Sequence, residues 1–283
     1  MPELPEVQTV VVQLDRKITG KTIRSFWSDW GKKIYSSKTT FAKKIKGAAV
    51  LGVRRFGKHI VIDLDNGYSI VAHLKMTGHF LYKTEENRDD KAFTEDPING
   101  YIHHIITFSD GATLEFSDMR KFGWLRAVET GEAEMLSSIM TLGIDALSPK
   151  LTQDVFKGLL LARSSRPIGA VLLEQHLIAG IGNIYRSEAL FLAGILPMRR
   201  IADIKPSEWP KILPAIKKVL RHAVRLHGTS DGDFRDTDGL PGRFQRTLFV
   251  YRRQGEPCKK CGTIIVRKKM GQRSVFYCSS CQK

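Results

Sequence analysis

Hydrophobic and polar positions change their spacing along this chain. Over residues 3–18 apolar side chains recur at helical intervals, which predicts an amphipathic helix. From about 22 to 126 the spacing becomes that of strands, and short turns containing Gly separate two clear hairpins, 59–64 with 69–74 and 102–108 with 112–116. The polar segment 84–100 is expected to be a surface loop. The first part of the chain is therefore predicted to be mainly antiparallel β-structure with a leading helix.

Helical spacing returns after residues 142–151, whose irregular pattern predicts an interdomain linker. The apolar run 168–179 predicts a buried helix that stops at Gly180-Ile181-Gly182, and Asn183 is expected to start the next helix. A further amphipathic helix is predicted for residues 207–228. The expected organisation is a β-domain at 1–141, the linker at 142–151, a helical domain at 152–242 and a final segment at 243–283.

The composition is that of a globular protein, with 42% hydrophobic and 26% charged residues and no apolar run long enough to span a membrane. No secretory leader is recognisable, so a cytoplasmic location is expected. The net charge of +16 favours a polyanionic partner, because Lys and Arg placed on phosphates release condensed counterions. A basic but solvated surface is the alternative. Residues 243–283 hold eleven Lys or Arg and one acid, which concentrates ten of the sixteen net charges there.

The same segment contains all four cysteines, as Cys258-x2-Cys261 and Cys278-x2-Cys281. Two tight turns that each supply a pair of thiolates match a four-cysteine zinc site. Two disulfides or free thiols are the alternatives, which a cytoplasmic chain with every cysteine in one motif disfavours. Four sulfurs leave no open position, so one structural Zn²⁺ is predicted, and it would supply folding free energy to a ribbon with little core. Such a ribbon indicates nucleic acid but no particular chemistry.

The N-terminal Met1-Pro2-Glu3 allows two interpretations. Methionine is usually removed before a small second residue, which would leave the secondary amine of Pro2 as a chain terminus that is partly neutral and nucleophilic. Alternatively, Pro2 and Pro5 only start a helix, which the short N-terminal string by itself favours.

Several strings together resemble the formamidopyrimidine-DNA glycosylase family (Fpg, or MutM, of the Fpg/Nei group). They extend from residue 2 to residue 283 in the family's order: MPELPEV, GKHIVIDL, HLKMTGHF, SDMRKFGW, LLEQHLIAGIGNIYRSEAL, GLPGRFQRTLFVYRRQGEPC and the cysteine ribbon. The resemblance implies a multidomain α+β protein. Its expected parts are an N-terminal antiparallel β-sandwich with flanking helices, a helix–two-turn–helix domain and a C-terminal four-cysteine zinc ribbon.

The resemblance also implies the catalytic residues. Pro2 would attack C1′ of a damaged nucleotide and form a Schiff base, and Glu3 would act as the acid. Lys58 would contact phosphate and assist β-elimination, whereas by itself it would be assigned to a surface charge. Arg273 would bind the phosphate of the lesion and assist δ-elimination.

Five further residues match the family's DNA contacts. Met76, Arg120 and Phe122 would fill the gap left by an extruded base and contact its orphaned partner, although by themselves Met76 and Phe122 would be assigned to core packing. Asn183 would meet a phosphate at a helix N-terminus, with a plain Asn cap as the alternative. Tyr101 aligns where the family often has His, at a DNA-contacting position.

Other positions are also compared with the family pattern. Gly228-Thr229-Ser230 resembles the loop that closes over an oxidised purine. Gly169 stands where the family has Lys, Gln8 replaces a usual Glu, and Met119 and Lys121 depart from Asp-Pro-Arg-Arg-Phe-Gly. None of these departures removes the nucleophile, the acid or the intercalating set.

The resulting hypothesis is a base-excision-repair DNA glycosylase with AP lyase activity. It would excise oxidised purines, namely 8-oxoguanine and formamidopyrimidines, and nick the strand by β,δ-elimination. Its expected partner is double-stranded DNA with oxidised bases or abasic sites, bound by a monomer. An endonuclease VIII-type enzyme for oxidised pyrimidines and a non-catalytic DNA-binding relative are the alternatives. Leu4 and the Gly228 loop favour the purine branch.

Overall fold

The computed structural model describes residues 1–283 and divides into two compact units. Unit 1 comprises Met1–Met140 and Leu226–Gln245, and unit 2 comprises Thr141–Arg225 and Arg246–Lys283. The chain therefore leaves unit 1, builds most of unit 2 and returns to unit 1 for a short segment before it completes unit 2. No helix is long and apolar enough to cross a membrane. The domain boundaries predicted from the sequence, at 1–141, 142–151, 152–242 and 243–283, describe functional parts of the chain and stay a prediction.

Unit 1 contains two four-stranded antiparallel sheets. The first, in spatial order, consists of β1 (Ile23–Ser28), β6 (Ile102–Phe108), β7 (Thr113–Ser117) and β5 (His79–Lys83). The second consists of β2 (Val50–Phe56), β3 (His59–Leu64), β4 (Tyr68–His73) and β8 (Trp124–Glu129). Both hairpins predicted from the polar turns are confirmed, as β3–β4 and β6–β7. One hydrophobic core contains residues from both sheets, as a β-sandwich requires.

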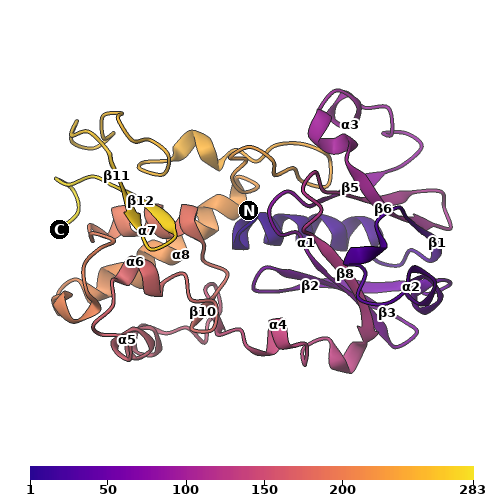
Figure 1. Cartoon of the computed structure of the whole chain (residues 1–283), viewed down its shortest axis with the longest axis horizontal. Coiled ribbons are helices and arrows are strands. Elements are labelled where there is room, and N and C mark those ends of the chain that lie inside the picture. The colour runs from indigo at the N-terminus through magenta and orange to yellow at the C-terminus, as the bar shows by residue number, and fades with distance from the viewer. The chain divides into compact units, whose positions relative to one another are not determined.

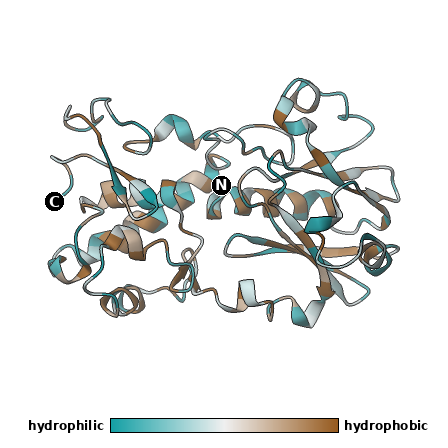
Figure 2. Ribbon diagram, viewed as in Figure 1, coloured by the Kyte–Doolittle hydropathy of each residue, from teal (hydrophilic) through white to brown (hydrophobic).

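Helix α1 (Leu4–Ile18) runs between the two sheets of unit 1 (Figure 1). It begins at Glu3 with a capping box in which Glu3 and Glu6 each accept from the other's backbone N–H. The predicted apolar stripe is buried throughout: Val7, Val10, Val11, Leu14 and Ile18. Helix α2 (Lys38–Ile45) contributes Phe41 and Ile45 to the same core. Figure 2 shows apolar and polar residues sharing each helix, as the amphipathic pattern predicts.

The segment 84–100 is more ordered than the predicted surface loop. It contains the short helix α3 (Lys91–Thr94) and a 3-10 turn at Pro97–Gly100, and it buries Phe93 and Asn99. The side chain of Asn99 bonds the carbonyls of Ala92 and Gly239 and the ring of His79. Two of these partners, His79 and Gly239, lie outside the segment, so its local polarity did not reveal them.

Unit 2 is mainly helical, with a β-ribbon at its end. Helices α5 (Gln153–Leu161) and α7 (Asn183–Ala193) both pack on α8 (Trp209–Arg225). The ribbon strands β11 (Val266–Met270) and β12 (Arg273–Tyr277) are antiparallel, and β12 packs on α7. The predicted start of a helix at Asn183 is confirmed. The remaining short elements are α4 (Ser137–Met140) and 3-10 turns at Gly31–Lys33, Thr130–Glu132, Ile201–Asp203 and Phe244–Thr247.

The predicted single helix at 168–179 is wrong. Helix α6 covers only Ile168–Val171, a series of turns follows, and β10 (Ile178–Ala179) pairs in parallel with β9 (Ile144–Asp145). Much of the run is buried, and its apolar residues suit a buried helix and a short buried strand equally well. Pairing with residues 144–145, which lie more than thirty positions earlier, decides between them.

Candidate functional site

The N-terminus of α1 lies in a buried part of unit 1. Pro2 is buried and Glu3 is 3% exposed. The Glu3 backbone N–H donates to Glu6 Oε2 at 2.7 Å, and the Thr229 N–H donates to Glu6 Oε1 at 2.6 Å. A single carboxylate thus joins the start of α1 to the segment that follows α8. The sequence does not reveal this role of Glu6, because nothing local indicates a partner 223 residues away.

Gly228 is required at this junction. Its φ is +79°, and a Cβ there would lie 2.6 Å from Glu6 Oε1. Residues beyond it are held by side chains of α1. Gln13 Nε2 donates to Asp236 at 3.0 Å, and Lys17 Nζ donates to Asp238 at 2.5 Å. The predicted lesion-binding loop and the predicted nucleophile therefore belong to one compact unit.

Lys58 lies at the turn between β2 and β3 and is 7% exposed, so it is not the ordinary surface charge that its sequence position alone would suggest. Arg55 holds this turn, because its Nη1 donates to the Gly57 carbonyl at 2.8 Å. The Arg55 Nε in turn donates to Gln8 Oε1 at 2.7 Å. Gln8, which departs from the family pattern, still provides an acceptor on α1.

The structure brings Met76, Arg120 and Phe122 onto two connected loops. Met76 and Phe122 are 39% and 45% exposed, which contradicts assignment to core packing. The Arg120 guanidinium lies over the Phe122 ring, 4.9 Å from its centroid. Lys75 and Lys121, which flank the two apolar side chains, have φ values of +55° and +57°. Such strained backbone persists only where its surroundings hold it, as at ligand-contacting loops.

Asp118 organises these loops and was missed as a functional residue. It is 1% exposed and accepts from the Thr77 hydroxyl and from the N–H groups of Arg120 and Gly123, at 3.2 and 2.7 Å. Its own N–H donates to the carbonyl of Tyr101, whose side chain is 42% exposed. The signal was present, since an Asp before a turn commonly caps backbone N–H groups.

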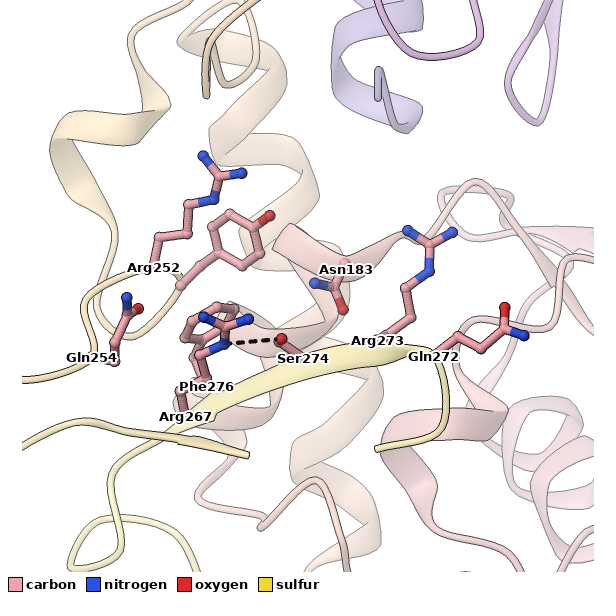
Figure 3. Close-up of a pocket in the computed structure, with 9 residues that line it drawn as sticks. Asn183, Arg252, Gln254, Arg267, Gln272, Arg273, Ser274 and Phe276 are labelled. Atoms are coloured by element: carbon pink, nitrogen blue, oxygen red, sulfur yellow. Dashed lines mark hydrogen bonds between the residues drawn. The ribbon is translucent and has the colours of Figure 1, made fainter. Parts of the chain in front are cut away.

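Unit 2 contains a polar pocket of about 430 Å³ (Figure 3). Asn183 and Arg273 both line it, although ninety positions separate them in sequence. The guanidinium groups of Arg252 and Arg273 extend in the same direction on either side of Asn183. Asn183 is also the first residue of α7, and the positive end of the helix dipole there adds to an environment that suits an anion. The full lining is Asn183, Tyr251, Arg252, Gln254, Arg267, Gln272, Arg273, Ser274 and Phe276.

The four cysteines form a metal site. The Sγ atoms lie within 4.8 Å of one another, with 3.9 Å between Cys258 and Cys281 and 3.5 Å between Cys261 and Cys278. A tetrahedron with Zn–S bonds of about 2.3 Å has sulfurs about 3.8 Å apart, so the arrangement fits one zinc ion.

Three family descriptions match the chain in order. They are "Formamidopyrimidine-DNA glycosylase N-terminal domain" over residues 1–125, the "H2TH domain" of the same family over 142–234, and "Zinc finger found in FPG and IleRS" over 255–283. Relatives named formamidopyrimidine-DNA glycosylase from Pelotomaculum thermopropionicum and Desulfitobacterium hafniense are each 38% identical. The matches span 100% of this chain and 99% and 100% of theirs.

Solved structures agree with this match. The MutM (Fpg) protein of Thermus thermophilus is 34% identical, with a TM-score of 0.84 over 99% of this chain and 98% of that one. The Lactococcus lactis Fpg in complex with DNA containing an abasic site is 28% identical, with a TM-score of 0.87 over 99% of both chains. The fold and the cysteine cluster are those of a zinc-finger DNA-repair glycosylase. The chain belongs to the formamidopyrimidine-DNA glycosylase family.

Proposed function

We propose that this family member is a bifunctional DNA glycosylase and AP lyase that excises oxidised purines from double-stranded DNA. The observation that carries the proposal is the Glu6 carboxylate, which bonds both the Glu3 N–H and the Thr229 N–H. It holds the segment beginning at Gly228 against the start of α1, next to Pro2. A nucleophile and a lesion-binding loop have to act on the same nucleotide, so this connection supports their pairing.

The proposed chemistry starts at the Pro2 nitrogen after removal of Met1. Its lone pair forms a bond to C1′, the bond from C1′ to the damaged base breaks, and the base leaves with the bonding electrons and takes up the proton that the Pro2 nitrogen releases. Glu3 donates a proton to the sugar ring oxygen as the C1′–O4′ bond breaks, which leaves a cationic iminium on the opened sugar. Loss of a C2′ proton then expels the 3′ phosphate, and a second elimination expels the 5′ phosphate.

The other residues bind and orient the DNA. Lys58 and Arg273 are proposed to contact the phosphates that leave. Met76, Arg120 and Phe122 are proposed to occupy the gap after base extrusion, because two exposed apolar side chains beside a guanidinium suit an unstacked step.

Asn183 and Tyr101 are proposed to contact the backbone. The zinc ion would hold the ribbon and take no part in the chemistry, since four sulfurs fill its coordination. A monomer with a nucleoid-associated cytoplasmic location completes the proposal.

The substrate class is supported by relatives. The Lactococcus lactis protein has been solved with DNA containing an abasic site, and a mutant of it with DNA containing Fapy-dG. The proposed purine preference separates this chain from the endonuclease VIII type. Excision of 8-oxoguanine should exceed excision of thymine glycol in otherwise identical duplexes, and the reverse order would favour the pyrimidine branch.

Borohydride trapping tests the proposal directly. Reduction during reaction with an 8-oxoguanine duplex should join protein and DNA covalently, and peptide mapping should locate the link at Pro2. A Pro2→Gly variant, and a protein with an uncleaved N-terminal tag, should lose trapping while DNA binding is retained. Binding without any trapped product in the unmodified protein would support the non-catalytic alternative. A link at a lysine would show that the nucleophile is wrong.

A further inference from the structure

Arg186 is the largest side chain that is completely buried in the protein, with 0% exposure. It lies on α7, one helical turn after Asn183, and both residues belong to unit 2. Its Nη1 donates to the Gly169 carbonyl at 2.7 Å, and its Nη2 donates to the Ser274 carbonyl at 3.2 Å and to Asn183 Oδ1. One guanidinium thus connects α6, the start of α7 and the ribbon strand β12.

The bond to Asn183 determines which end of that amide faces away from Arg186. A guanidinium has only donors, so the oxygen of the Asn183 amide has to face it. Reversing the amide would place its NH₂ group against the Arg186 Nη2 donor in a partly buried position, so one N–H of Nη2 would lose its acceptor. The Asn183 NH₂ group is therefore the end that is left for a ligand in the pocket, and an NH₂ group donates to anionic oxygens.

The bond to Ser274 acts on the other side of the same pocket. Ser274 directly follows Arg273 on β12, and both residues line the pocket (Figure 3). Fixing the Ser274 carbonyl fixes the backbone that carries Arg273. The two predicted phosphate contacts are consequently oriented by one buried group that itself does not line the pocket.

Gly169 completes the arrangement. A Cβ at this position would lie 2.8 Å from the Pro197 carbonyl oxygen and 3.0 Å from Met270 Cε, so a side chain does not fit without movement. The absence of a side chain lets α6 approach closely, and its carbonyl is available to Arg186. Gly169, which departs from the family pattern, thus accepts a hydrogen bond from Arg186.

We infer that Arg186 is a positioning residue for DNA phosphate: it orients the Asn183 amide and the Arg273 strand so that both donate to one phosphodiester. The inference rests on the proposed function, because DNA is the ligand that it assigns to the pocket. It does not depend on the glycosylase chemistry.

A double-mutant cycle tests the inference. Arg186→Met, Asn183→Ala and the double variant would be compared by fluorescence anisotropy on a duplex containing a tetrahydrofuran abasic analogue. A hydrogen bond to a charged group corresponds to about tenfold or more in affinity, so each single variant should bind at least about tenfold more weakly. The double variant should bind within about threefold of the weaker single variant, because both remove the same contact.

The matched control is Arg199→Met. Arg199 is a largely buried arginine of unit 2 that bonds Glu208 and does not line the pocket. Any effect of this change should multiply with that of Asn183→Ala instead of saturating. The dependence of affinity on salt gives a second readout. Displacement of the cationic Arg273 from its phosphate in Arg186→Met should reduce the magnitude of the slope of log K against log salt by about 0.9, which a merely destabilised protein would not show.

Zinc content and thermal melting would establish that Arg186→Met is folded. If it is not, Arg186→Lys replaces it, because one ammonium keeps the charge but cannot reproduce the two parallel arms of the guanidinium. Wild-type affinity in Arg186→Lys, or multiplicative losses in the double variant, would overturn the inference while leaving the proposed function intact. Failure of the wild-type protein to bind the duplex would overturn the proposed function itself.

Discussion

Mild acid should destabilise unit 1 through two histidines on neighbouring strands. His59 on β3 pairs directly with His73 on β4, and their ring centroids are 4.7 Å apart beside Trp124. Burial is the main cause that lowers the pKa of His59 to about 4 and that of His73 to about 2. The Lys75 N–H also donates to His73 Nδ1 at 2.9 Å, so a proton on that nitrogen would meet another donor.

The sign follows from the unfolded chain, in which both rings have a pKa near 6.5. Above about pH 7.5 neither state binds these protons. As the pH falls through 6.5 the unfolded state takes up two protons that the folded state does not, so the free energy of unfolding decreases. Each histidine contributes a slope of up to about 1.4 kcal/mol per pH unit, or about 2 kcal/mol between pH 7 and 5. The pair therefore removes about 4 kcal/mol, a large part of a typical domain stability of about 5–15 kcal/mol.

Urea unfolding at pH 7, 6 and 5, followed by tryptophan fluorescence, measures this slope. His73→Gln removes one of these titrations, while His79 and His104 of unit 1, whose pKa values burial also lowers, still contribute. The variant should therefore reduce the loss of stability between pH 7 and 5 by about 2 kcal/mol. The control is His176→Gln, because the side chain of His176 is 55% exposed and lies in unit 2. A slope that is unchanged by His73→Gln, or a wild-type stability that is constant between pH 7 and 5, would refute the reasoning.

Three further predictions concern the rest of the molecule. Glu188→Ala should destabilise unit 2 by about 3–5 kcal/mol, because the buried carboxylate accepts from the N–H groups of Phe249, Val250 and Tyr251 at 2.8–3.0 Å. Denaturant unfolding measures this loss, and a loss below about 1 kcal/mol would contradict it. Gly228→Ala should reduce excision by far more than Gly20→Ala, because only a Cβ at Gly228 would meet Glu6. Gly20 is the matched control, since its φ of +82° is similar and a Cβ there would meet open space. Equal excision rates in the two variants would exclude a role for that contact. Removal of zinc by a chelator should unfold the ribbon and weaken DNA binding while unit 1 keeps its melting temperature. Metal analysis would verify the loss of zinc, and a ribbon that stays folded by circular dichroism would contradict the prediction.

Helix α1, the β3–β4 and β6–β7 hairpins and the zinc cysteines were all predictable because their signals are local. Helical spacing over fifteen residues, a polar turn between two apolar runs and two Cys-x2-Cys pairs each describe a structure that neighbouring residues form by themselves. The exposure of Met76 and Phe122 was not predictable from their type, since apolar residues are usually buried. Their exposure results from the conformation of two strained loops, which are joined by the hydrogen bond between Asp118 and Thr77.

The sequence by itself thus determined the class of fold, the metal site and the family resemblance, together with the candidate residues that the resemblance brings. Tertiary structure alone decided that the segment at Leu226–Gln245 returns to unit 1, that Glu6 bonds Thr229 of this segment, and that Arg186 bonds the carbonyls of Gly169 and Ser274. It also divided the apolar run 168–179 into a short helix and a strand. The physical reason is the same throughout: these features depend on hydrogen bonds and pairings between residues far apart in the chain, and no local period or spacing records such partners.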